Sequence, residues 1–208
     1  PAGALSMKSH AGCLSFEMSS GEHQVIVNCG APSPDHADWR FVARTTPAHS
    51  TLTFADASSA TFAGGANGSA PLPDATLSGP ANAQFTLSED SEDGLELKGS
   101  HDGYLARYGV SHSRRVTLSP DGSLLRGEDR LSAPRGLKGD AQANGGAFAV
   151  RFHFHPAVKA SLKEDERTVA LLLPNGETWM LTANTPTIAV EESVFLADER
   201  GPRRSLQV

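Results

Sequence analysis

Short runs in which apolar and polar residues alternate recur along almost the whole chain. Residues 14–18 alternate in this way, a turn-forming segment follows at 19–22, and residues 24–29 return as a second apolar-rich run. A period of two residues is typical of strands that bury one face. The pattern therefore predicts a β-hairpin, followed by two more strands at residues 39–46 and 50–54.

The second half of the chain repeats this pattern between clear turn signals. The dipeptides Asp121-Gly122 and Asn175-Gly176 predict two tight hairpin turns. Residues 147–155 alternate strictly, so we expect one strand with its phenylalanines toward the core and with His153 and His155 on the other face. Further strands are expected at residues 84–89, 94–100, 105–112, 115–119, 124–131, 158–162, 168–173, 177–182, 187–194 and 204–208.

Many short strands without a sustained helical period predict an all-β fold, a large two-sheet antiparallel β-sandwich. We expect residues 1–208 to form one such domain. The residues between 55 and 83 are rich in Ala, Ser, Gly and Pro, and they predict a surface excursion from the sandwich.

The composition narrows the classes of function. Charged residues make up 20% of the chain and hydrophobic residues 38%, which is typical of a soluble globular protein and not of a disordered one. A net charge of −6 argues against general nucleic-acid binding, and no apolar run is long enough to span a membrane. Because the chain starts at Pro1 without an initiator methionine, we expect a fragment or a processed product, and its localisation cannot be read from this end.

The two cysteines, Cys13 and Cys29, fall on the two strands of the predicted hairpin. If the turn is centred between residues 20 and 23, they lie nearly opposite each other and a cross-strand disulfide is possible. Two buried free thiols are the alternative. The pair does not decide the redox compartment.

Three side chains beside the first strands can bind a metal ion: His10, Asn28 and His49. Two imidazoles and an amide oxygen suit a zinc-like or calcium-like ion, although a carboxylate is missing. The alternatives are two unrelated histidines, each with its own hydrogen bonds, and an asparagine that bonds a neighbouring loop.

Other aromatic and polar residues could line a sugar-binding cleft. His101 and Tyr104 flank an Asp-Gly pair, so they bring an imidazole and a phenol together, unless they only form a turn with a core tyrosine. Trp39 follows a polar loop and could stack on a sugar, whereas Trp179 lies in an alternating strand and is expected in the core. The sequence has no nucleophile elbow, P-loop or dinucleotide fingerprint.

The order and spacing of several segments resemble the C-terminal β-sandwich of the heparinase II/III-like polysaccharide lyases. The resemblance spans nearly the whole chain and includes a late Leu-Leu-Leu-Pro-Asn-Gly-Glu-Thr-Trp run. The segments that carry it are residues 9–18, 25–30, 48–52, 100–104, 114–131, 151–156 and 171–179.

This resemblance implies a two-part enzyme, in which an N-terminal α-helical toroid that this chain lacks packs on the sandwich. The implied reaction is β-elimination at a uronic acid: the carboxylate is neutralised, a base removes the C5 proton, and an acid protonates the leaving oxygen. The implied partners are the toroid and an acidic polysaccharide, glycosaminoglycan-like or alginate-like, in a periplasmic or secreted protein. We expect this chain alone to be inactive. An apolar patch left where the toroid docks would favour a homodimer.

Residue by residue, the resemblance is incomplete. His10 matches the second histidine of the family's His-Ala-His-Ala-Asp-like motif, whereas Lys8 stands at the first, catalytic histidine and Gly12 at the aspartate. Asn28 stands at an acidic metal ligand, and His49 keeps the histidine of its segment.

The resemblance and the residues together predict three candidate groups. A non-catalytic carbohydrate-binding or structural module is the alternative, and the lysine at the catalytic histidine position favours it. The candidates are Lys8, His10 and Tyr104 for catalysis, Trp39, His101 and Arg107 for substrate binding, and His10, Asn28 and His49 for one divalent metal ion, zinc or calcium.

Overall fold

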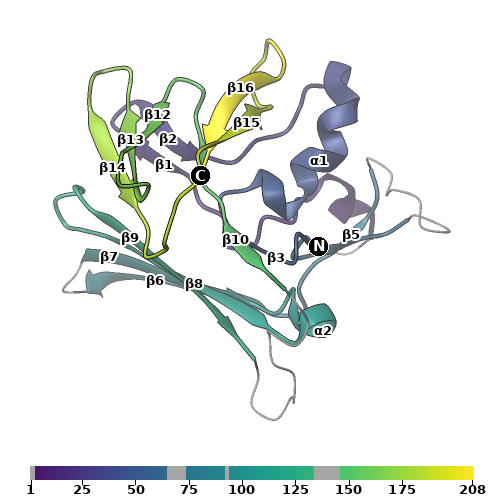
Figure 1. Ribbon diagram of the computed structural model, residues 1–208. Coiled ribbons are helices and arrows are strands. Elements are labelled where there is room, and N and C mark those ends of the chain that lie inside the picture. Colours follow the sequence, from purple (N-terminus) through teal and green to yellow (C-terminus); the bar gives the residue numbers. More distant parts are fainter. Residues whose placement is uncertain (1–2, 65–73, 92–93, 134–145) are drawn as a thin grey trace.

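The computed structural model describes residues 3–64, 74–91, 94–133 and 146–208. Its strands form antiparallel sheets in two main layers, a four-stranded sheet on one side and a five-stranded and a three-stranded sheet on the other (Figure 1). The prediction of an all-β antiparallel sandwich is confirmed. No helix among the described residues is long and apolar enough to cross a membrane.

The sheets are built from segments that are far apart in the sequence. The four-stranded sheet contains, in spatial order, β6 (Ala83–Ser91), β7 (Gly94–His101), β8 (Ser111–Leu118) and β9 (Leu125–Ser132). The five-stranded sheet contains β1 (Met18–Ser20), β2 (His23–Val27), β11 (His153–Phe154), β16 (Arg203–Gln207) and β15 (Glu191–Phe195). The remaining sheets are β12 (Lys159–Leu162), β13 (Thr168–Leu172) and β14 (Thr178–Thr182), the pair β10 (Phe148–Val150) and β3 (Leu52–Phe54), and the pair β4 (Thr61–Phe62) and β5 (Leu77–Ser78).

Both predicted hairpin turns are present. Asp121-Gly122 joins β8 to β9, and Asn175-Gly176 joins β13 to β14. The two glycines have φ angles of +71° and +88°, which cost a glycine no steric clash. The side chains of Asp121 and Asn175 accept hydrogen bonds from backbone N–H groups two residues further along, so each turn is stabilised locally.

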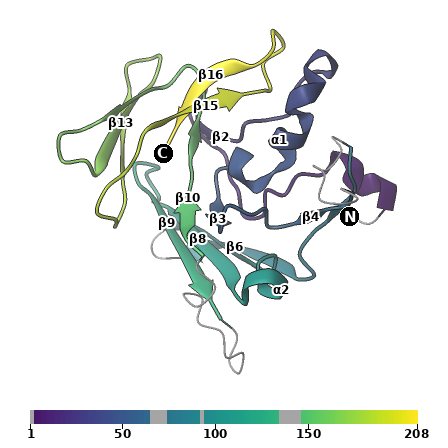
Figure 2. The ribbon, with the colours of Figure 1, turned by 45° about the vertical axis from the view of Figure 1, so that its right-hand side comes forward.

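The predicted strand at residues 39–46 is wrong, because short helices take its place (Figure 2). Pro34 begins the 3-10 helix η2 (Pro34–Trp39), where its missing N–H is not needed, and α1 (Arg40–Arg44) and η3 (Thr46–Ala48) follow. The helix-start signal at Ser33-Pro34-Asp35 outweighs the strand expected at residues 39–46. The other short helices are η1 (Gly3–Lys8) and α2 (Leu105–Tyr108), which replaces the start of the strand expected at 105–112.

The single strand expected at residues 147–155 is divided between two sheets. Phe148 belongs to β10 and is 62% exposed, whereas Phe154 in β11 is fully buried. His153 is also buried, so its expected place on the face away from the core is wrong. Its ring nitrogens bond the Pro47 carbonyl and the Ser193 hydroxyl, which gives a buried imidazole its partners.

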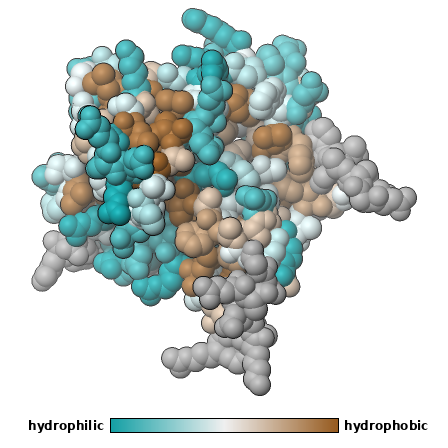
Figure 3. Space-filling view, viewed as in Figure 1, coloured by the Kyte–Doolittle hydropathy of each residue, from teal (hydrophilic) through white to brown (hydrophobic). Residues whose placement is uncertain are grey.

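The core consists of separate apolar clusters. One joins the five-stranded sheet to β13 through Val25, Phe154 and Leu171. Apolar residues also reach the surface over the three-stranded sheet (Figure 3), where Leu172 and Met180 are 41% and 53% exposed. The homodimer expected through an apolar patch stays a prediction.

Both cysteines are free thiols. The first strand begins only at Met18, so Cys13 lies outside the hairpin, and Cys29 follows β2. Burial raises the pKa of Cys29 to about 11, and the protonated thiol packs as a small apolar group.

Candidate functional site

His10 and His49 meet although 39 residues separate them in the sequence. His10 Nδ1 lies 3.2 Å from His49 Nε2, and the rings stand edge to face. His49 follows η3, and His10 lies two residues after η1. The two expected neighbours therefore share one site.

The hydrogen bonds of His49 determine which nitrogens carry protons. His49 Nδ1 lies 2.8 Å from the carbonyl oxygen of Thr45, and a carbonyl can only accept. Nδ1 therefore carries the proton, His49 Nε2 has the lone pair, and His10 Nδ1–H donates to it. Among the described residues no hydrogen bond to His10 Nε2 is present, and its lone pair is left for a ligand.

Both imidazoles are neutral near pH 7. Burial lowers the pKa of His49 to about 4, outweighing the hydrogen bond to Thr45 that favours the charged form. The pKa of His10 is also lowered, first by burial and then by the positive charge of Arg44. The imidazole of His10 is half-buried, and its Nε2 can accept a hydrogen bond or a proton.

Arg44 holds the segment that carries His10, and the sequence analysis missed it. Its Nε donates to the Ser9 carbonyl at 2.9 Å, and its own carbonyl accepts from Ala11 N–H at 2.8 Å. The residues on both sides of His10 are therefore fixed to the last residue of α1. The side chain is 2% exposed and lies over the ring of Phe62.

Asn28 and Gly12 limit what else the site can hold. Asn28 Oδ1 accepts from Ser50 N–H at 2.9 Å, and its Nδ2 donates to Glu17 at 3.1 Å. A Cβ atom on Gly12 would lie 2.6 Å from the ring of His49, which leaves no room for an acidic side chain at that position.

The residues present do not form a complete metal site. The 3.2 Å between the two histidine nitrogens is close to the roughly 3.4 Å that two nitrogens span on one tetrahedral zinc ion. The oxygen of Asn28, however, is already bonded, and the described residues contain no group of three or more His, Cys, Asp or Glu side chains arranged to hold a metal.

The other predicted site residues do not join the histidine pair. Tyr104 is fully buried and donates its hydroxyl to the Leu52 carbonyl, and burial raises its pKa to about 12. His101 is 3% exposed and bonds His112. Neither side chain can reach a polysaccharide in this structure, so the catalytic role expected of Tyr104 and the binding role expected of His101 have no geometric support.

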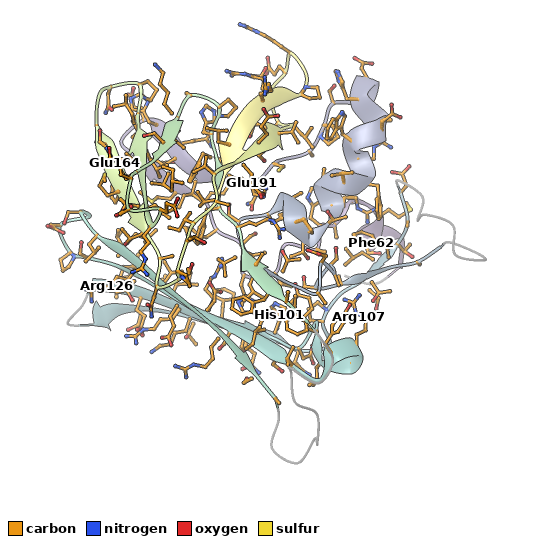
Figure 4. The ribbon with its side chains drawn as sticks, viewed as in Figure 1. Phe62, His101, Arg107, Arg126, Glu164 and Glu191 are labelled. Atoms are coloured by element: carbon orange, nitrogen blue, oxygen red, sulfur yellow. The ribbon has the colours of Figure 1, made fainter. Side chains whose placement is uncertain are left out.

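Lys8, Trp39 and Arg107 lie at the surface on three different helices. Lys8 ends η1 with an exposed side chain, and Trp39 ends η2 and is 38% exposed. Arg107 belongs to α2 and donates to the Ser58 carbonyl (Figure 4). Among the described contacts, none joins any of the three to His10 or His49.

A second histidine pair, His101 and His112, lies on the inward face of the four-stranded sheet. The sequence did not predict that Asp129 and Arg114 bond to this pair. His101 Nε2 lies 3.1 Å from His112 Nδ1, and His112 Nε2 lies 2.6 Å from Asp129. Arg114 donates to both oxygens of that carboxylate, at 2.8 and 2.9 Å. The sequence of β8 contained a signal for this cluster. His112, Arg114 and the apolar Val116 follow one another at intervals of two residues, so they lie on the same face of the strand.

The comparisons with known proteins match this fold. A family described as "Heparinase II/III-like, C-terminal" matches residues 1–208. The chain belongs to the heparinase II/III-like family. Its fold is similar to the crystal structure of the heparan sulfate lyase HepC from Pedobacter heparinus, with a TM-score of 0.65 and 14% identity over 95% of this chain and 27% of that one. A mutant of the same lyase gives a TM-score of 0.64 at 13% identity.

A curated relative of this heparinase II/III-like chain carries a different kind of name. "FtsZ-localized protein C" of Caulobacter vibrioides is 32% identical over 197 residues, which are 93% of this chain and 33% of the relative. The chain thus spans about a third of the curated relative and about a quarter of the lyase structure. The comparisons show the family and the fold of this chain.

Proposed function

We propose that the chain forms one wall of the substrate cleft of a polysaccharide lyase that cleaves a uronate-containing polymer by β-elimination. The observation that carries the proposal is the neutral His10–His49 pair, held at 3.2 Å with one lone pair left for a ligand. The family of the chain and the fold it shares with a heparan sulfate lyase support the proposal.

In this proposal His10 Nε2 accepts the proton at C5 of the uronate. His10 Nδ1–H donates to His49 Nε2, and His49 Nδ1–H donates to Thr45, so the ring of His10 is held by a chain of two hydrogen bonds. The exposed ammonium of Lys8, two residues earlier, neutralises the uronate carboxylate. The acid that protonates the leaving oxygen comes from another part of the protein.

The proposal includes partners that this chain does not contain. An N-terminal toroid would form the opposite wall, the protein would be periplasmic or secreted, and this chain alone would be inactive. Zinc or calcium at His10, Asn28 and His49 stays a prediction, with the bonded amide of Asn28 against it.

A non-catalytic binding or structural module is the second candidate. The lysine at position 8, where the resemblance places the catalytic histidine, favours it. So does the name of the curated relative, which refers to localisation with FtsZ and not to a lyase activity. Under this candidate the chain would contribute to an assembly at FtsZ and would cleave nothing.

The experiment that separates the candidates is a turnover assay on the complete gene product. The substrates are heparan sulfate, alginate and polygalacturonate, and the readout is the ultraviolet absorbance of the unsaturated sugar. We expect product with one polymer, and a loss of at least a hundredfold in His10→Gln, which removes the proposed base. His23→Gln, a change at the start of β2, is the matched control. No product from any uronate polymer would leave the second candidate.

A further inference from the structure

The outward face of the four-stranded sheet carries two adjoining hollows, of about 420 and 500 Å³. Both are bordered by Arg115 and Glu128, which lie directly opposite each other on β8 and β9. The inward face of the same strands carries His101, His112 and Asp129. The hollows therefore form a groove on the side of the sheet away from the packed core.

The exposed side chains along this groove are mostly cationic. Lys98, Arg115, Arg126 and Arg130 line it, and Glu128 is the one anionic side chain among the residues that border the two hollows. Glu96 lies beneath Lys98 and Arg115, 8% exposed, and bonds both of them. These four cations and two glutamates sum to a charge of +2, on a chain whose net charge is −6.

The fixed guanidinium groups match carboxylates. Arg115 and Lys98 are opposite each other in the register, and the buried carboxylate of Glu96 holds their side chains over the sheet. A planar guanidinium binds a carboxylate through two parallel hydrogen bonds. Arg130 forms an ion pair with Glu128 in which both side chains are exposed. A ligand carboxylate can therefore take the place of Glu128 at little cost in free energy.

The remaining lining suits a sugar better than a peptide. Hydroxyl and amide side chains fill the spaces between the cations, among them Gln84, Thr86 and Ser100, and these can bond sugar hydroxyls. A peptide strand would need a row of apolar pockets, and the described residues form none here.

We propose that this groove binds an anionic polysaccharide chain, at a site separate from His10 and His49. The hollows extend from Ser113 to Ser119, about 20 Å along β8 and enough for several sugar rings. Figure 4 shows Arg126 toward the end of the sheet far from His101 and Arg107. The inference takes its ligand class from the proposed function but needs no cleavage at the histidine pair.

The test is the affinity of the purified protein for polygalacturonate, measured by calorimetry and by native electrophoresis in gels that contain the polymer. Dextran is the neutral comparison, and an oligothymidine strand and polyglutamate are the other anionic ones. Arg115→Gln and, separately, Arg126→Gln each remove one cation from the groove. Arg126 bonds no other described residue, so its loss leaves the fold intact. Arg200→Gln removes an exposed arginine outside the groove. Glu128→Gln removes the negative charge of the glutamate that borders the groove.

We expect binding to polygalacturonate and not to dextran, weakened about tenfold in Arg115→Gln and several-fold in Arg126→Gln. Arg200→Gln should bind as the native protein does, and Glu128→Gln should bind at least as tightly. Equal weakening in Arg200→Gln, no binding to polygalacturonate, or tighter binding of oligothymidine or polyglutamate would each overturn the inference. His10→Gln should keep groove binding, so a failed cleavage assay and a failed groove are distinguishable.

Discussion

His10 and His49 bond through one Nδ1 and one Nε2 at 3.2 Å, and His101 and His112 bond through the same two kinds of atom at 3.1 Å. Both pairs stand edge to face. They differ in how their hydrogen-bond chains end. The first chain ends at a lone pair on the half-buried ring of His10, whereas the second begins at Gly103 N–H and ends at the carboxylate of Asp129.

The groups at the ends of each hydrogen-bond chain decide whether the histidine pair can bind a ligand. In the second chain all four imidazole nitrogens are bonded, so no ligand can enter it without breaking a buried hydrogen bond. Arg114, paired with Asp129, also donates to the Leu14 and Ser50 carbonyls, and it fastens β8 to the segments that follow His10 and His49. The second pair is therefore structural, and the first is the candidate for chemistry.

The largest expected effect is on the structural pair. Asp129→Ala leaves Arg114 as a buried charge and His112 without its acceptor, and we expect the free energy of unfolding to fall by about 3–5 kcal/mol. Urea unfolding followed by circular dichroism measures it. Glu128→Ala, the neighbouring exposed acid, should change it by less than about 0.5 kcal/mol. Similar losses in both variants would contradict a special role for the buried carboxylate.

The acid sensitivity of the first pair comes next. The pKa of His49 is about 4 when folded, against 6.5 in the unfolded chain, so the unfolded state takes up its proton first as the pH falls. The contribution of the neutral His49 to the free energy of unfolding is complete above pH 6.5. It falls by about 3 kcal/mol as the pH drops toward 4. Unfolding measured between pH 7 and 4.5 should show a shallower pH dependence in His49→Gln. His23→Gln controls for the substitution itself, and an unchanged slope in His49→Gln would disprove the assignment.

Arg114→Lys sharpens the comparison without removing the charge. Lysine cannot hold both oxygens of Asp129 and also reach two carbonyls, so we expect a loss of about 2 kcal/mol. Arg115→Lys changes the next residue of β8, whose side chain lies on the outward face, and it should cost much less. Thermal unfolding of both variants at pH 7 decides this. Equal stabilities would mean that the bidentate geometry contributes little.

The sequence predicted well what depends on local chemistry. The alternation, the Asp-Gly turn and the Asn-Gly turn each need only neighbouring residues, and the sandwich followed from them. The helices at Pro34–Arg44 were missed because a strand was expected at residues 39–46 in spite of the Ser-Pro-Asp start signal just before them. Arg44 and Arg114 were missed as organising residues because their carbonyl partners lie 35 to 100 residues away, and alternation says nothing about such distances. The nearness of His10 to His49 was expected from their places beside the first strands and from the family resemblance, since a separation of 39 residues fixes no distance.

The smallest expected effect on stability is also the sharpest test of the comparison. His10→Gln removes one donor from a half-buried chain whose inner member keeps its bond to Thr45, so the free energy of unfolding should fall by less than about 1 kcal/mol. The imidazole ¹⁵N shift of His49 Nε2, measured by NMR, should move because its hydrogen-bond donor is gone. His112→Gln should leave that shift in place and lower stability more, since it interrupts the buried chain to Asp129. If His10→Gln were more destabilising than His112→Gln, the His10–His49 pair would be as structural as the His101–His112 pair. The free lone pair of His10 would then no longer indicate a ligand site.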